Sequence, residues 1–251
     1  MSADASRSAV PSPRHGYTAA QVRAAEAPLL AAGEPLMERA AAALADEIER
    51  LIARATDVGG RPLVIVLAGS GDNGGDALFA GAHLAERGAD VRLVAVGARL
   101  HEAGAAAAHG AGAVDLDPDA DADAFAAAID AADVLVDGIL GIGAAASPAL
   151  RGRPRETVAR VLERLAERGH AERPPGTRHP LVVAVDLPSG ISPDDGRVPD
   201  PTVLPADLTV TMGAVKAGLL LPPASRLAGR VVLVDLGLGP ALADVEPVVT
   251  V

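Results

Sequence analysis

The fold of this chain is decided by one stretch, Val64-Ile65-Val66-Leu67-Ala68-Gly69-Ser70-Gly71-Asp72-Asn73-Gly74-Gly75-Asp76. It begins with a continuous apolar run, which is typical of a parallel strand covered on both faces. The glycines that follow spell G-x-G-x-x-G and predict a tight turn that opens a helix. Backbone N–H groups at such a turn, together with the positive end of the helix, favour a nucleotide or another phosphorylated ligand.

The polar residues of this turn differ from those of an ordinary dinucleotide fingerprint. Such a fingerprint places an acid at the end of the second strand, where it binds the ribose hydroxyls. Here the next expected strand, 91–96, is followed by Gly97-Ala98-Arg99, which contains no acid. Asp72 and Asp76 lie in the turn instead, and their carboxylates would repel a pyrophosphate unless a cation or a hydroxyl donor intervenes. The sequence therefore predicts a ligand loop unlike that of a common NAD dehydrogenase.

The composition sets limits on the class of protein. A chain of 251 residues can form one large α/β domain, and with two Phe, one Tyr and no Trp its core must be built from aliphatic side chains. The net charge of −11 argues against a nucleic-acid partner, and the absence of cysteine excludes disulfides, Cys–zinc sites and a thiol nucleophile. Because no apolar stretch approaches the roughly 20 residues of a membrane span and residues 1–15 lack a signal-peptide core, we expect a cytoplasmic protein without a membrane partner.

Apolar periodicity predicts two helices followed by alternating strands and helices. The helix from Thr18 to about Gly33 and the helix after Pro35 are expected to cover the fold and to offer a candidate oligomer face. The apolar stripe of the second helix is expected to be buried. The expected strands lie near 62–68, 90–96, 133–137, 181–185, 207–212 and 230–236, and the expected helices near 76–87, 100–109, 125–131 and 151–168. This order predicts a doubly wound, mostly parallel sheet with helices on both faces. Residues 172–180 are expected to form a surface connection.

A ladder of aspartates runs from Asp115 to Asp123 at every second position. An EF-hand would need glycine at its sixth position and glutamate at its twelfth, and no register of this segment supplies them. We therefore interpret the ladder as a solvated loop leading into the acidic first turn of a helix.

Informative polar residues follow three of the expected strands, at the sheet edge where doubly wound proteins bind ligands. They are the turn 69–76, Asp137 with its glycine-rich loop, and Asp186 with Ser189. Asp186 could act as a general acid or base, or merely cap a turn, and the oxygen ligands at these strand ends also suit a hard cation. Lys216, the single lysine, is either a solvated side chain or a contact to a ligand phosphate.

Several motifs together resemble the NAD(P)H-hydrate epimerase family, the YjeF N-terminal domain. They are the turn 69–76, the segment Val136-Asp137-Gly138-Ile139-Leu140-Gly141-Ile142-Gly143, the segment Val185-Asp186-Leu187-Pro188-Ser189-Gly190, and 206–223 with Lys216. Glu26 and residues 36–40 resemble the N-terminal helices of the family. The resemblance implies a Rossmann-like epimerase domain over residues 17–238. The composition of the N-terminal residues predicts a disordered tail over 1–16, and residues 239–251 are expected to form a C-terminal tail.

The resemblance also implies an activity and its residues. The family interconverts the R and S epimers of hydrated NADH or NADPH, damaged cofactors with a hydroxyl at C6 of the nicotinamide ring, and thereby takes part in cofactor repair. By motif, one potassium ion would be held by Asn73, Asp137 and Ser189. Asp186 would contact the modified ring as the acid/base. The ligand would also contact Asp72, Asn73, Gly74, Gly75, Asp76, Gly141, Ile142, Gly143, Ala144, Ala145, Ala146, Ser147 and Lys216.

Two residues depart from the family pattern, and they bear on ligand affinity. Asp72 stands where the family usually has Asn, and Ile142 where it usually has Thr. The resemblance implies a homodimer and, because the chain ends soon after its last expected strand, a separate NAD(P)H-hydrate dehydratase as functional partner. The alternative is a non-catalytic nucleotide-ligand or protein-binding module of the same fold. A third alternative is an ordinary nicotinamide oxidoreductase, but this sequence lacks the acid with which such an enzyme binds the ribose hydroxyls.

Overall fold

A computed structural model describes residues 14–55, 60–170 and 179–251, and its centre is a parallel sheet. The seven strands lie in the order β4-β3-β2-β5-β6-β7-β8, and every neighbouring pair is parallel. Their bounds are β2 Leu63–Ala68, β3 Asp90–Ala95, β4 Val114–Asp115, β5 Val134–Gly138, β6 Leu181–Val185, β7 Leu208–Met212 and β8 Arg230–Val234. The chain order reverses between β2 and β5, so the loops after these two strands flank the crevice where such sheets bind ligands.

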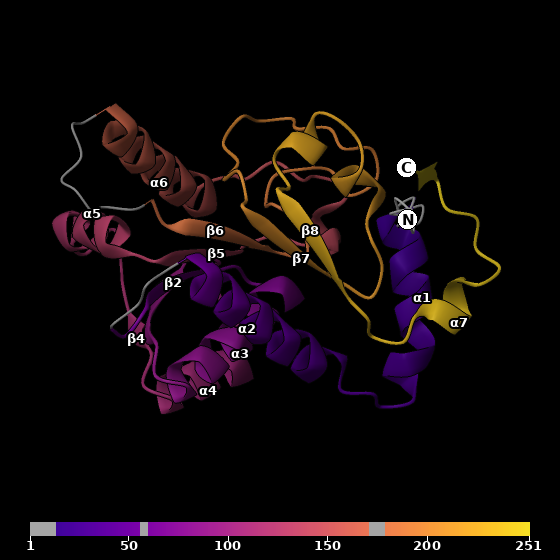
Figure 1. Ribbon diagram of the computed structural model, residues 1–251, viewed down its shortest axis with the longest axis horizontal. Coiled ribbons are helices and arrows are strands. Elements are labelled where there is room, and N and C mark those ends of the chain that lie inside the picture. The colour runs from indigo at the N-terminus through magenta and orange to yellow at the C-terminus, as the bar shows by residue number, and fades with distance from the viewer. Residues whose placement is uncertain (1–13, 56–59, 171–178) are drawn as a thin grey trace, which may run out of the picture.

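Helices cover both faces of this sheet, as predicted (Figure 1). One face packs against α2 (Leu36–Ala55), α3 (Asp72–Glu86) and α4 (Glu102–Gly110), and the other against α5 (Ala122–Ala131) and α6 (Arg153–His170). The central strands are buried on both faces because their side chains alternate between the two clusters: Val64 and Val66 join the first, Ile65 and Leu67 the second. Because both faces of these strands are buried, their sequences are apolar at every position rather than at every second one.

The two N-terminal helices take different positions (Figure 1). The apolar stripe of α2, which includes Leu44 and Ile48, is buried against the sheet, as predicted. Helix α1 (Ala19–Ala31) packs instead against α7 (Gly239–Leu242) and the segment after β7, through Val22 and Ala25. It therefore lies near the carboxyl ends of the strands rather than on a sheet face.

The structure moves one boundary that matters for the site. Helix α3 begins at Asp72, four residues before the predicted start, so residues 72–76 form its first turn and are not a separate loop. The two glycines at 74 and 75 had suggested a turn, because glycine is unfavourable inside helices. Tertiary packing overrides this preference, as both glycines are buried.

The ends of the described chain also differ from the prediction. Residues 239–251, predicted as a tail, contain α7 and β9 (Val249–Thr250), and β9 pairs antiparallel with β1 (His15–Gly16). The tail predicted over residues 1–16 and the connection over 172–180 fall mostly outside the described residues. In the described chain, no helix has the length and apolar character needed to cross a membrane.

The aspartate ladder has a structural role. Asp121 caps α5 by accepting the N–H of Ala124 at 2.8 Å, and Asp117 accepts the N–H of Asp119 at 3.0 Å. Arg153 and Arg160 of α6 pair with Asp117 and Asp119. These contacts agree with a solvated loop leading into a capped helix.

Candidate active site

The glycines of the decisive turn have separate functions. A Cβ on Gly69 would lie 1.9 Å from the carbonyl oxygen of Ile139, and a Cβ on Gly74 would lie 2.2 Å from that of Gly69. These two positions therefore admit only glycine, because the strand β2, the helix α3 and the loop after β5 approach so closely. Gly71 meets nothing within 4 Å and lines a cavity. The spacing thus builds the turn with two glycines and leaves the third open to a ligand.

A cavity of about 630 Å³ opens at the carboxyl ends of the central strands. This volume falls in the range of small-molecule sites. Nine predicted site residues line it: Asp72, Asn73, Asp76, Gly141, Ile142, Gly143, Ala144, Asp186 and Lys216. On α3, Asp76 lies four positions after Asp72 and three after Asn73, so it is a neighbour of both on the helix surface, and all three line the cavity. The positive N-terminal end of α3 therefore borders the same space.

Asp186 and Lys216 form a buried ion pair in this cavity. Lys216 Nζ donates to Asp186 Oδ1, to the carbonyl of Met212 at 2.7 Å and to Thr211 Oγ1 at 3.3 Å. Asp186 Oδ1 also accepts the N–H of Met212 at 3.2 Å. With an exposed fraction of 1%, Lys216 is not the solvated lysine that one interpretation expected. Its three protons already have partners, so a direct bond to a ligand phosphate would require one of these bonds to break.

Asp186, which lines the cavity, has an unusual backbone conformation. Its φ of 67° is in the left-handed region, and it is the one non-glycine residue with positive φ in the described chain. Aspartate tolerates this region better than most residues, but the conformation is still costly. The N–H of Asp186 donates to Val210 at 2.8 Å, which holds the residue at the end of β6. Strain of this kind is found where a side chain is fixed for a function.

Two further carboxyl groups of the cavity have raised pKa values. Burial raises the pKa of Asp76 to about 8, and the charges of Asp186, Asp72 and Glu26 add to this effect. Burial also raises the pKa of Glu26, against the opposing charge of Lys216. Acids with raised pKa values beside a buried ion pair are typical of sites that transfer protons.

The predicted cation ligands lie around the loop after β5. Asp137 is fully buried, and its carboxylate accepts the N–H of Ser189 at 2.8 Å and that of Ile139 at 3.3 Å. Burial raises the pKa of Asp137. Ser189 Oγ bonds to both the N–H (2.8 Å) and the carbonyl (3.3 Å) of Leu140. The third predicted ligand, Asn73, lies against Gly141 in the same loop.

An orphaned polar atom supports a cation at this place. Within the described residues, the side-chain amide nitrogen of Asn73 is buried and has no hydrogen-bond partner. A half-turn of the amide would bring its oxygen to the same position, where it could bind a cation. A hard cation needs oxygen ligands, and Asp137, Ser189 and Asn73 supply them. No group of three or more His, Cys, Asp or Glu in the part of the chain described is placed to hold a metal. The three predicted ligands would instead offer one carboxylate, one hydroxyl and one amide oxygen.

Some predicted ligand contacts have other positions. Gly75 is turned away from the cavity, because a Cβ there would meet Met37 and His101 at 3.1 Å, and Gly74 packs on Gly69. Residues 145–147 do not line the cavity either, and Ala146 and Ser147 are exposed. The short helix Ile142–Ala144 carries the part of this loop that does. Ile142 also packs against apolar residues and accepts a bond from Arg23 Nη1 through its carbonyl at 3.1 Å.

Residue-level reasoning assigned no site role to Arg23 and Glu26 of α1, which both line the cavity. They are the only charged residues of that helix, and they lie three positions apart, so they share a face. An isolated pair of charged residues in an Ala/Leu-rich helix was the feature of the sequence that could have indicated a role in the site. Because α1 is remote in sequence from the strands, only the tertiary structure shows which element its charged face meets.

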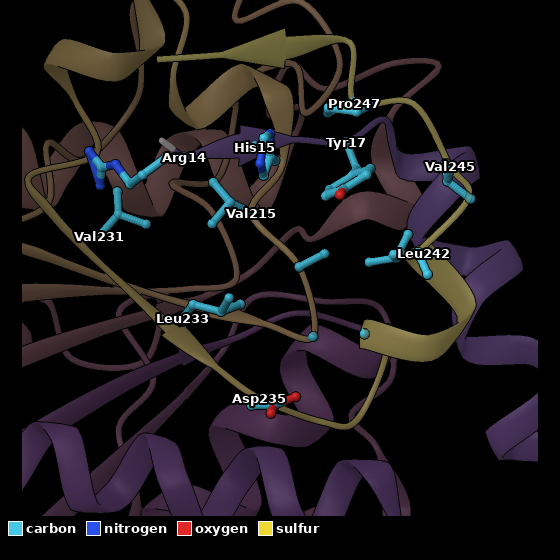
Figure 2. A pocket seen from close by; sticks show the side chains of 14 residues that line it. Arg14, His15, Tyr17, Val215, Val231, Leu233, Asp235, Leu242, Val245 and Pro247 are labelled. Carbon is cyan, nitrogen blue, oxygen red and sulfur yellow. The ribbon is translucent and has the colours of Figure 1, made fainter. Parts of the chain in front are cut away.

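A second cavity, of about 720 Å³, lies beside the edge strand β8 and is mostly apolar. Figure 2 shows Val231 and Leu233 of β8 on one side of it, and Tyr17 and Leu242 on the other. It contains none of the predicted site residues. The end of β7 and the segment after it separate the two cavities: Gly213, Ala214 and Val215 line the apolar one, whereas Met212 and Lys216 line the charged one.

The fold and the charged cavity define a class: a Rossmann-like α/β protein with a ligand site at the switch point of its sheet and groups for proton transfer inside it. The family described as YjeF-related protein N-terminus matches residues 33–218. The chain therefore belongs to the YjeF N-terminal family.

Individual relatives agree with this assignment. The chain is 51% identical to an NAD(P)H-hydrate epimerase of Clavibacter sepedonicus, over 89% of this chain and 90% of the relative. It is 41% identical to a bifunctional NAD(P)H-hydrate repair enzyme, Nnr, of Mycobacterium tuberculosis, over 92% of this chain and 43% of the relative. The crystal structure of the yeast protein ynu0, YNL200c, has the same fold with a TM-score of 0.69, at 18% identity, over 92% of this chain and 94% of the yeast chain.

Proposed function

We propose that this protein is an NAD(P)H-hydrate epimerase, which interconverts the R and S epimers of hydrated NADH or NADPH. The observation that carries the proposal is the buried pair of Asp186 and Lys216, which faces one cavity with the glycine-built end of α3. It stands in a chain that matches epimerases over nine-tenths of its length. The reaction takes part in the repair of nicotinamide cofactors.

The ligand is placed by the two loops that border the switch point. Gly71 leaves room for the ligand to approach the backbone, and the N-terminal end of α3 attracts its phosphates. Residues 141–144 form the opposite wall. Asp72 adds a negative charge beside the helix end, and Ile142 adds an apolar contact in place of a hydroxyl.

Asp186 is the residue proposed to contact the hydrated ring. Its Oδ1 is fixed by Lys216, Thr211 and the N–H of Met212, while the side chain borders the cavity. A positioned carboxylate stabilises positive charge that develops on the ring when the C6 hydroxyl departs. Lys216 acts as a positioning residue, because its own donors are engaged by protein oxygens.

A potassium ion is proposed at Asn73, Asp137 and Ser189. The buried carboxyl of Asp137 and the orphaned amide of Asn73 support it. A bound cation would supply positive charge that offsets Asp137 close to the ligand loop. The family resemblance further indicates a homodimer, and a separate NAD(P)H-hydrate dehydratase as functional partner. The bifunctional repair enzyme among the relatives supports the pairing of two repair activities.

The test is an epimerisation assay with purified R-NADHX, the hydrate of NADH, in potassium buffer, followed by chromatographic separation of the S form. We expect rapid equilibration by the wild-type protein and at least a thousandfold lower rate for Asp186→Asn. Asparagine tolerates the positive φ at this position and matches the shape of aspartate, so the loss would report the missing charge. Replacing potassium by tetramethylammonium should lower the rate if the cation proposal holds.

A matched control is Asp123→Asn, an exposed aspartate in the first turn of α5, which should behave as wild type. Wild-type protein that does not exceed the spontaneous rate would contradict the epimerase function and favour a binding module. Full activity in Asp186→Asn would contradict the role of Asp186 alone.

A further inference from the structure

The charged cavity contains more acids than its bases can neutralise. Four carboxyl groups line it, from Glu26, Asp72, Asp76 and Asp186, against two cationic side chains, Arg23 and Lys216. Lys216 is engaged with Asp186, and Arg23 is exposed and bonds to the carbonyl of Ile142. The remaining acids therefore repel one another across a partly buried space, and a cluster of this kind holds a proton.

Asp76 is the member of the cluster best placed to hold that proton. It is half-buried in the first turns of α3, whereas Asp72 at the start of the same helix is exposed. The charged groups that act on it are Asp72 of its own helix, Glu26 of α1, Asp186 after β6 and Lys216 after β7. Three of the four are acids, and its pKa of about 8 leaves it largely protonated at neutral pH.

The geometry points to Asp76 as the proton donor to the C6 hydroxyl of the hydrate, with Asp186 as the carboxylate that stabilises the ring. Two carboxyl groups in one cavity with different environments divide the acid and base functions in this way. This inference rests on the proposed epimerase function and deepens it by naming a second catalytic residue.

The step balances without a co-reactant. The proton of Asp76 moves to the C6 hydroxyl oxygen, the C6–O bond breaks, and its electron pair leaves with the oxygen as water. The lone pair of the adjacent ring nitrogen forms a C=N bond, so the ring becomes cationic. Water then adds to the other face of C6, the C=N pair returns to nitrogen, and the surplus proton of that water returns to Asp76. The product is the opposite epimer and the enzyme is unchanged.

The experiment compares Asp76→Asn with Asp76→Glu across pH 5.5 to 9.5, in the epimerisation assay above. Asparagine keeps the shape and hydrogen-bonding capacity of the side chain but has no proton to transfer. We expect its kcat to fall by about 10²- to 10⁴-fold, the range for loss of a general acid, with KM changed less than about threefold. Glutamate keeps a proton donor and should retain a measurable part of kcat.

The pH profile supplies a readout that a structural role would not move. Protonated Asp76 is the active form, so wild-type kcat/KM should decline as pH rises through about 8. This alkaline decline should be absent from Asp76→Asn and present in the Asp123→Asn control. Equal losses in the asparagine and glutamate variants, or an asparagine variant with wild-type rate and the same alkaline decline, would overturn the assignment. Wild-type protein without activity would instead contradict the proposed function.

Discussion

Two cavities of similar size lie on either side of the segment that follows β7, and they differ in chemistry. The cavity beside β8 is the larger, about 720 Å³, and its walls are mostly aliphatic. The cavity at the switch point measures about 630 Å³ and gathers acids, one lysine and a helix N-terminus. Size alone would favour the first. The charged groups favour the second as the proposed site, because chemistry needs polar groups fixed in a protected space.

The difference arises within five residues. From Met212 to Lys216 the chain turns so that its first and last residues face the charged cavity and the three between them face the apolar one. Gly213 permits this turn with a φ of 71°. The backbone of Tyr17 holds the segment from the other side, through bonds of 2.9 Å to the carbonyl of Val215 and 2.8 Å from the N–H of Ala217.

The largest effect is expected from Lys216→Met, a substitution in the segment that separates the two cavities. Methionine has a similar length but no charge, so Asp186 would remain buried without its ion-pair partner. We expect the free energy of unfolding to fall by about 3–5 kcal/mol, as is typical when one partner of a buried pair is removed. Urea denaturation followed by circular dichroism measures this loss.

The control for this prediction is the half-buried pair of Arg92 and Asp90 at the edge of the sheet, whose side chains are 36% and 39% exposed. Arg92→Met should cost less than about 1 kcal/mol, since surface pairs contribute little. The double variant Lys216→Met/Asp186→Asn should recover part of the stability, because it removes both charges. If Lys216→Met cost no more than Arg92→Met, the buried pair would not be the element that distinguishes the two cavities.

An effect on stability that depends on pH is expected from Asp76→Asn. The folded-state pKa of Asp76 is raised above its unfolded value of 3.8 to about 8, so folding opposes its ionisation. Its contribution to stability is therefore fully present below pH 3.8 and is lost as pH rises toward 8. Asparagine does not ionise, so the free energy of unfolding of the variant should rise relative to that of wild type as pH rises through that window. The slope is at most about 1.4 kcal/mol for each pH unit.

Urea denaturation of both proteins at pH 5 and at pH 8 measures this change in their relative stability. At pH 8 the variant should be the more stable protein although it is the slower enzyme. Parallel stability curves for the two proteins over this range would show that Asp76 has an ordinary pKa, and would remove a support for its role as acid.

The smallest effect is expected in the apolar cavity. Leu233 of β8 has an exposed fraction of 47%, so Leu233→Ser should change the free energy of unfolding by only a few tenths of a kcal/mol. Its kcat and KM for the hydrate should stay within twofold of wild type. A marked change in kcat in the epimerisation assay would link the two cavities and weaken the distinction between them.

The fold could be predicted far better than the site. Continuous apolar runs such as Val64–Ala68 define buried strands by themselves, and the order of strands and helices limits the topology. The start of α3 was misplaced because local preference disfavours Gly74 and Gly75 in a helix, whereas their close packing requires them there. The C-terminal residues were predicted as a tail because the two-residue strand β9 has too short a pattern to detect.

By itself, the sequence determined the glycine spacing after β2, the strand-end positions of Asp137 and Asp186, and the family. These features are local, since each depends on residues that are adjacent along the chain. Only the tertiary structure decided that Lys216 pairs with Asp186, 30 positions away, and that Glu26 and Asp76 face the same cavity. The ionisation of a carboxyl group depends on burial and on charges contributed by other elements, and these are fixed only when the chain is folded.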